Sequence, residues 1–110
     1  SSQDYELAAV IIRDLAKKYD IDVLNINLRS NDTFPPLNRH TKVKQVPLER
    51  HRIDLRLNGE FLDIGLFFDT VEEQIKSINL HSYKFSLDQN AAKKVIADVV
   101  YYTYRMDRES

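Results

Sequence analysis

The dipeptide Asn58-Gly59 constrains the fold of this chain more than any other feature, because alternating apolar residues flank it on both sides. Such a dipeptide between alternating runs is typical of a two-residue turn that joins antiparallel strands. In the register set by this turn, one face of the hairpin collects Ile53, Leu55, Leu57, Leu62, Ile64, Leu66 and Phe68. These side chains make a consistent core face. We therefore expect a β-hairpin centred on residues 58–59.

Charge changes sign at the same dipeptide. Residues 39–56 carry six cations and two acids, whereas residues 57–73 carry five acids and no cation. A hairpin would fold these blocks together, with Asp54 facing Asp63 and with arginines diagonal to both. This pattern favours a cross-strand ladder of salt bridges, each worth about 0.2–1 kcal/mol. An alternative use of the two facing aspartates is a metal-dependent hydrolase, because paired carboxylates can shift a pKa or bind a cation.

Four further segments precede the hairpin. Apolar residues recur at helical spacing over residues 4–19, which predicts a helix. Residues 22–29 alternate between apolar and polar and predict a strand with one covered face. Turn residues and two prolines over residues 30–38 indicate a loop. A short extended segment is expected at residues 41–46, before Pro47.

The segments after the hairpin predict a strand between two helices. Thr70-Val71-Glu72-Glu73 has the form of a capping box and favours a short helix within residues 69–81, with a strand as the alternative. Residues 80–87 alternate and predict a strand. Asp88–Arg108 is expected to be a long helix, because apolar residues recur there at helical spacing. Its stripe comprises Ala92, Val95, Ile96, Val99, Tyr102 and Met106.

Together these elements predict an α+β fold. We expect a mainly antiparallel sheet of about four strands with the N- and C-terminal helices packed on one face, in the order α-β-β-β-(α)-β-α. The 110 residues suit a single domain, which a longer protein could contain because the chain begins with Ser1 rather than Met.

Composition narrows the function classes. The chain has no cysteine, which excludes disulfides, thiolate catalysis and cysteine-ligated metals and favours a cytoplasmic or other reducing compartment. A net charge of −1 argues against general coating of nucleic acid. No apolar run approaches the ~20 residues of a membrane helix, so we expect no membrane partner.

Catalytic and cofactor signatures are also missing from the sequence. His40, His51 and His81 lack the spacing of a helical metal motif. Gly59 and Gly65 are the two glycines, and neither is placed to make a phosphate-binding loop. The serines lie in no GxSxG elbow. We therefore predict a non-enzymatic domain without metal or cofactor.

Aromatic residues outside the predicted core indicate a binding surface. Phe61 and Phe67 flank Gly65 and point away from the core face of the predicted hairpin. Such an apolar strip is either covered by another element as a second core layer or forms a partner-binding patch, and the glycine would allow close approach. Tyr101 and Tyr104 on the predicted last helix add an interface-favoured residue type. The sequence thus predicts protein–protein interaction, with a protein partner or a second copy of the chain.

The basic stretch supports a second hypothesis. Arg39, Lys42, Lys44 and Arg50 are the cations that the predicted hairpin leaves without acidic partners. They could bind nucleic acid or another anionic ligand, with binding that weakens as salt rises. A solvated loop is the alternative interpretation of the same residues.

Overall fold

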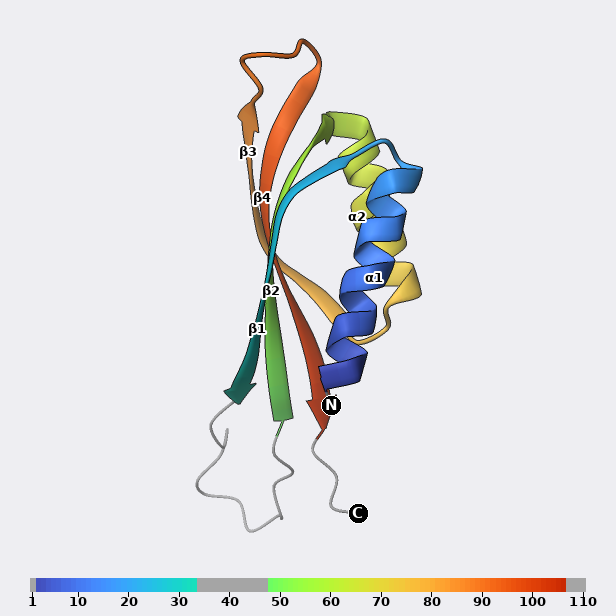
Figure 1. Cartoon of the computed structure of the whole chain (residues 1–110), viewed down its shortest axis with the longest axis vertical. Helices are drawn as coiled ribbons and strands as arrows, with labels where there is room; N and C mark the ends of the chain where they lie inside the picture. The colour runs from blue at the N-terminus through green and yellow to red at the C-terminus, as the bar shows by residue number, and fades with distance from the viewer. Residues whose placement is uncertain (1, 34–47, 107–110) are drawn as a thin grey trace.

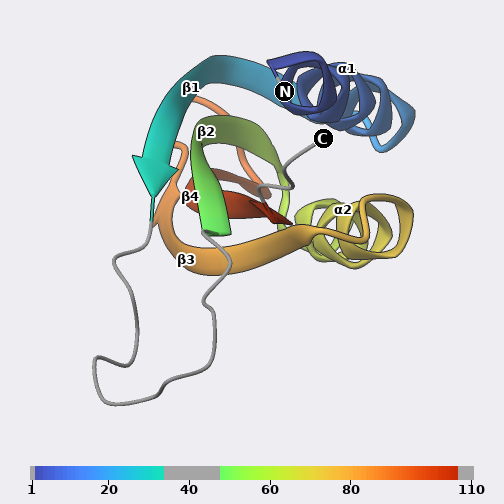
Figure 2. The same ribbon diagram turned by 90° about the horizontal axis from the view of Figure 1, so that it is seen from below.

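The computed structural model describes residues 2–33 and 48–106, with side chains placed over residues 6–29 and 50–104. The elements are α1 (Ser2–Lys18), β1 (Asp22–Thr33), β2 (Leu48–Glu60), α2 (Phe61–Gln74), β3 (Ile78–Leu87) and β4 (Lys94–Met106). The four strands form one antiparallel sheet in the order β1-β2-β4-β3. Both helices lie side by side on one face of this twisted sheet (Figures 1 and 2). The predicted fold class is confirmed, although the second packed helix is α2 and not a C-terminal one.

The core lies between the helices and the two central strands. On β2 the buried residues alternate as Ile53, Leu55 and Leu57, as expected of a strand with one covered face. Ala97, Val99 and Tyr101 do the same on β4. The helices supply buried side chains at three- and four-residue spacing, namely Ala8, Ile12, Leu15 and Ala16 from α1 and Ile64, Phe67 and Val71 from α2.

The predicted hairpin at Asn58-Gly59 is wrong, because β2 continues through both residues and pairs with β4 as far as Glu60 and Lys94. Gly59 does not adopt a positive φ. A Cβ there would lie 3.1 Å from Ile21 Cγ1, so the glycine allows close packing and makes no turn. Asn58 donates from Nδ2 to Asp88 Oδ2 at 2.9 Å and thereby ties the end of β2 to the β3–β4 connection.

The residues expected to form the second hairpin strand are the first turns of α2. Ile64, Phe67 and Val71 are fully buried at a spacing that only a helix produces, whereas Leu62 and Leu66 are exposed, against the prediction that they belong to the core. The expected helix start at Thr70 is wrong as well. Its Oγ1 donates to Leu66 O at 2.9 Å inside the continuous helix.

The predicted C-terminal helix is also wrong, because residues 94–106 form the central strand β4. The segment is rich in β-branched and aromatic residues, which favour strands. Asp88 does not cap a helix. It accepts a hydrogen bond from the Asn90 N–H at 2.9 Å in the turn after β3, and this bond and that from Asn58 hold the pKa of its carboxyl below the usual value.

The other predicted elements agree with the structure in part. α1 matches the helix expected over 4–19, and β3 matches the strand expected over 80–87. β1 includes the predicted strand and extends to Thr33, into the stretch expected to be a loop. The extended segment predicted at residues 41–46 lies outside the described residues.

Candidate protein-binding groove

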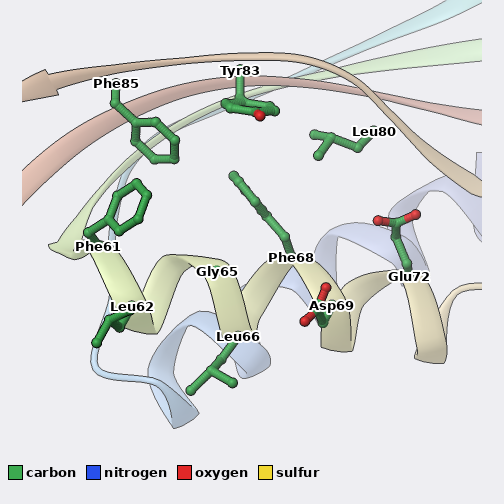
Figure 3. A pocket seen from close by; sticks show the side chains of 10 residues that line it. All are labelled: Phe61, Leu62, Gly65, Leu66, Phe68, Asp69, Glu72, Leu80, Tyr83 and Phe85. Atoms are coloured by element: carbon green, nitrogen blue, oxygen red, sulfur yellow. The ribbon is translucent and has the colours of Figure 1, made fainter.

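A groove with a volume of about 700 Å³ runs between α2 and β3. β3 is a terminal strand of the sheet, and α2 lies beneath the apolar face of that strand (Figure 3). The groove is lined by Phe61, Leu62, Gly65, Leu66, Phe68, Asp69 and Glu72 of α2 and by Leu80, Tyr83 and Phe85 of β3. Most of the lining is therefore aliphatic or aromatic.

Aromatic contacts fix how α2 and β3 are aligned. The ring centroids of Phe61 and Phe85 lie 5.0 Å apart in an edge-on arrangement, and those of Phe68 and Tyr83 lie 5.8 Å apart. Such geometries suit the charge distribution of aromatic rings. The start of the helix thus lies beside the end of the strand, so the two elements run antiparallel along the groove (Figure 3).

The groove is open to solvent. Phe61 is 55% exposed, Leu66 52% and Tyr83 57%. Gly65 lies midway along the helix side of the groove, where an added Cβ would have no heavy atom within 4 Å among those considered. The absence of a side chain at this position therefore leaves the middle of the groove unfilled.

The groove has an acidic end. Asp69 and Glu72 are the charged residues among those that line it, and Glu72 lies near the Leu80 end (Figure 3). α2 as a whole contains Asp63, Asp69, Glu72 and Glu73 and no lysine or arginine. A positively charged ligand would be favoured at this end of the groove.

The face of the sheet that points away from the two helices carries a ladder of salt bridges. Asp54 pairs with Arg52 Nε at 2.9 Å and with Arg29 Nε at 3.2 Å, and this carboxylate raises the pKa of Arg52. Arg56 lies 3.8 Å from Asp98. A ladder was expected, but Asp63 takes no part in it because that residue lies on α2. The predicted Asp54/Asp63 pair for a hydrolase is therefore wrong.

The predicted interface aromatics divide between surface and core. Phe61 lies in the groove, whereas Phe67 is fully buried beneath the sheet and cannot contact a partner. Tyr101 is also fully buried, and its burial raises the pKa of its hydroxyl. Tyr104 is partly buried, with its ring centroid 6.3 Å from that of Tyr102.

The basic residues of the second hypothesis are mostly outside the described part of the chain, which omits Arg39, Lys42 and Lys44. Arg50 is placed, and its guanidinium carbon lies 4.2 Å from the centroid of the Tyr102 ring. This is a cation–π contact within the domain. Arg50 therefore has a structural partner, and anion binding by the basic stretch stays a prediction.

His51 and His81, the histidines among the described residues, lie on different strands. His51 is buried at 7% exposure, His81 of β3 packs edge-on against Tyr102 of β4, and His40 lies outside those residues. Within residues 2–33 and 48–106, no three His, Cys, Asp or Glu side chains are placed to share a metal ion. Neither helix in this part of the chain has the length and apolarity needed to cross a bilayer.

Sequence reasoning missed Leu62, Leu66, Tyr83 and Phe85 as groove residues. Leu62 and Leu66 alternate with Ile64 and so fit a strand, but Ile64, Phe67 and Val71 also fit a helix. The helical spacing was the signal that could have placed Leu62 and Leu66 on the surface. Tyr83 and Phe85 were expected on the apolar face of their strand, where they are found, but the pattern does not reveal that the helices leave this face open.

No protein-family model and no curated protein sequence matches this chain. Solved structures do share its fold. The type 4 fimbrial biogenesis protein PilO from Pseudomonas aeruginosa superposes with a TM-score of 0.75 over 97% of this chain and 72% of that chain, at 15% identity. The core region of PilO from the type IV pilus system of the same organism gives a TM-score of 0.61 over 90% and 94% of the two chains, at 16% identity.

A crystal structure from Akkermansia muciniphila is also similar, with a TM-score of 0.66 over 100% of this chain and 55% of the other, at 11% identity. At identities this low, the likeness establishes a shared fold alone. The two-layer arrangement of α1 and α2 on a four-stranded antiparallel sheet is thus found in solved proteins.

Proposed function

We propose that this chain is a non-enzymatic protein-interaction domain that binds another protein through the α2/β3 groove. The observation that carries the proposal is the open apolar surface between Phe61 and Tyr83, which the described part of the chain leaves exposed. Contiguous exposed apolar surface is costly in water and marks interaction sites. Burial of this surface by a partner would supply the driving force for binding.

The fold comparisons support a role in a multiprotein assembly. The similar structures include a fimbrial biogenesis protein and the core region of a protein of a type IV pilus system. We extend this by proposal to the present chain, as a component of an assembly of that kind. The prediction of a reducing compartment rests on the absence of cysteine and is independent of this proposal, and cell fractionation would test it.

The proposal can be tested by site-specific photo-crosslinking in cells that carry the native gene. A photo-reactive amino acid is placed at Leu66, which is 52% exposed at the groove, or at Val10, which is 53% exposed on α1. We expect a discrete crosslinked protein from position 66 and none from position 10. Mass spectrometry of the crosslinked band would identify the partner.

The matched exposure of the two sites makes the comparison informative. Non-specific collisions would label both positions equally, because both helices present an apolar side chain to solvent there. Equal labelling at the two sites, or labelling at neither, would reject the groove as the interaction surface. A crosslink to a second copy of the chain would support interaction but assign it to self-association.

A further inference from the structure

We infer that the α2/β3 groove binds an extended segment of its partner, which adds a fifth strand beside β3 and places a basic side chain at Asp69 and Glu72. This inference rests on the proposed function and specifies the chemistry of the occupant. It follows from the strand edge, the spacing of groove residues along α2, and the charge of the groove.

The first part of the argument is the edge of the sheet. Among the described strands, β3 pairs with β4 and has no neighbour on its other side. The outer edge of a strand carries backbone donors and acceptors that can pair with an added strand. β3 lacks proline, which would block this pairing. Its apolar side chains face the groove, so an added strand would extend the roof of the groove (Figure 3).

The second part is a match of spacing. Phe61, Gly65 and Asp69 follow one another at four-residue steps along α2. Each step advances about 6 Å along a helix, close to the ~6.6 Å between alternate residues of a strand. Alternate side chains of an added strand would therefore meet these three positions in turn. About five residues of partner chain would span the groove.

The third part is what each position can accommodate. An apolar side chain suits the end at Phe61 and Phe85, whose rings are in edge-on contact. The middle position favours the largest apolar side chain, because no atom considered among the described residues lies within 4 Å of where a Cβ at Gly65 would be. Asp69 and Glu72 favour lysine or arginine at the last position. The expected pattern is apolar, any, large apolar, any, basic, read in either chain direction.

Charge also favours a different protein over a second copy. If the β3 strands of two copies paired around a two-fold axis, both α2 helices would lie on the same side of the joined sheet. Each α2 brings four acidic residues and no cation. Like charges facing each other across an interface oppose association. A partner strand with a basic side chain avoids this repulsion and is attracted to the acidic residues of α2.

The test uses two synthetic peptides with a fluorescent label at one end. In the first, a valine, a phenylalanine and a lysine occupy alternate positions with threonines between them, and in the second glutamate replaces the lysine. Both chain directions are made. Fluorescence anisotropy measures binding to the full chain, and amide chemical shifts of residues 78–87 report pairing at β3. We expect the lysine peptide to bind about tenfold more tightly at low salt.

Two substitutions and their matched controls locate the binding. Gly65→Trp should fill the groove and weaken binding more than about tenfold, whereas Gly65→Ala adds only a methyl group and should change it less than about threefold. Asp69→Lys should reverse the preference toward the glutamate peptide. Asp14→Lys, an equal change of charge at an exposed position on α1, should not reverse it. Circular dichroism confirms that each variant is folded.

Several results would overturn the inference. They are equal binding of the two peptides, unchanged binding by Gly65→Trp, amide shifts confined to elements other than β3, and absence of binding by every peptide. A concentration-dependent dimer that Gly65→Trp abolishes would assign the groove to a second copy and also overturn it. The crosslink from Leu66 would stand in the first four cases, so failure of this inference is distinguishable from failure of the proposed function.

Discussion

β3 and β4 are neighbouring strands that present apolar side chains to the same face of the sheet, yet these side chains lie in different environments. On β4, Ala97, Val99 and Tyr101 are at most 1% exposed. On β3, Tyr83 is 57% and Leu87 80% exposed. The helices therefore seal one strand and leave much of the next uncovered.

This difference separates stability from function. The side chains of β4 that point toward the helices, and the helix side chains packed against them, lie in a closed core. Loss of a contact there lowers the free energy of unfolding. The side chains of β3 and α2 that line the groove keep much of their contact with water. They therefore contribute less to the free energy of unfolding and retain apolar surface that a partner can bury. The same apolar pattern thus stabilises the domain on one strand and offers a binding surface on the next.

The sharpest test of this difference uses two phenylalanines of α2. Phe67→Ala should lower the free energy of unfolding by about 3–5 kcal/mol, because it leaves a cavity in the core. Phe61→Ala removes a side chain that is 55% exposed and should cost less than about 1.5 kcal/mol. Urea unfolding of both variants measures the two costs. Equal costs would show that the groove is part of the core.

A second test concerns the buried hydroxyl of Tyr101, which lacks a hydrogen-bond partner within the described part of the chain. Burial, and to a lesser degree the charge of Glu72, raise the pKa of this tyrosine well above its ordinary value. Above about pH 10 the unfolded chain releases this proton while the folded chain keeps it, so stability falls as pH rises, by up to ~1.4 kcal/mol per pH unit.

Tyr101→Phe should remove this alkaline loss of stability and change stability at pH 7 by no more than about 1 kcal/mol. Chemical unfolding at pH 7 and above pH 10 measures both effects. Tyr83→Phe is the control, because it removes the same hydroxyl group from a side chain that is largely exposed. A pH dependence that persists in Tyr101→Phe would contradict the burial of this hydroxyl.

The third test turns to the uncovered face of the sheet. Asp54 accepts from Arg52 and pairs with Arg29, so Asp54→Asn should cost about 1 kcal/mol, and less in high salt. Asp98→Asn is the matched control, because the Arg56–Asp98 pair is longer and half-exposed. Thermal unfolding at low and high salt compares them. A larger cost for Asp98→Asn would contradict the described ladder.

The smallest expected effect is at Gly65. Gly65→Ala should raise the free energy of unfolding by up to about 1 kcal/mol, because alanine favours a helix and its Cβ meets no neighbour. Denaturant unfolding detects the gain. A loss of stability would mean that another group occupies the space above Gly65, and the groove would then be closed.

The sequence predicts the fold class well because periodicity is clear where the apolar residues of an element are confined to one face. α1 and β3 show this, with helical spacing in the first and alternation in the second. β4 is central and carries apolar residues on both faces, since Ile96 and Val100 are partly buried opposite Ala97 and Val99. A strand that is apolar on both sides has no clear alternation, and its residues also fit a helical stripe.

Local turn chemistry misleads at Asn58-Gly59. The dipeptide favours a tight turn in isolation, but here Gly59 makes room for Ile21 and Asn58 bonds to Asp88. Both contacts join residues far apart in the chain, so a rule based on neighbouring residues cannot predict them. The groove could not be predicted from the sequence for the same reason, because its existence depends on where α2 lies relative to β3. Of the predicted site residues, Phe61 lies exposed in the groove, and its part in binding stays a prediction.

The most direct test of the central claim combines the crosslinking site with the groove-filling variant. A photo-reactive amino acid at position 66 is introduced into the wild-type chain, into Gly65→Ala and into Gly65→Trp, and the crosslinked partner is quantified in each. The account predicts that the partner band persists in wild type and Gly65→Ala and is lost in folded Gly65→Trp. An undiminished band in Gly65→Trp would contradict the claim that the partner occupies the groove between α2 and β3.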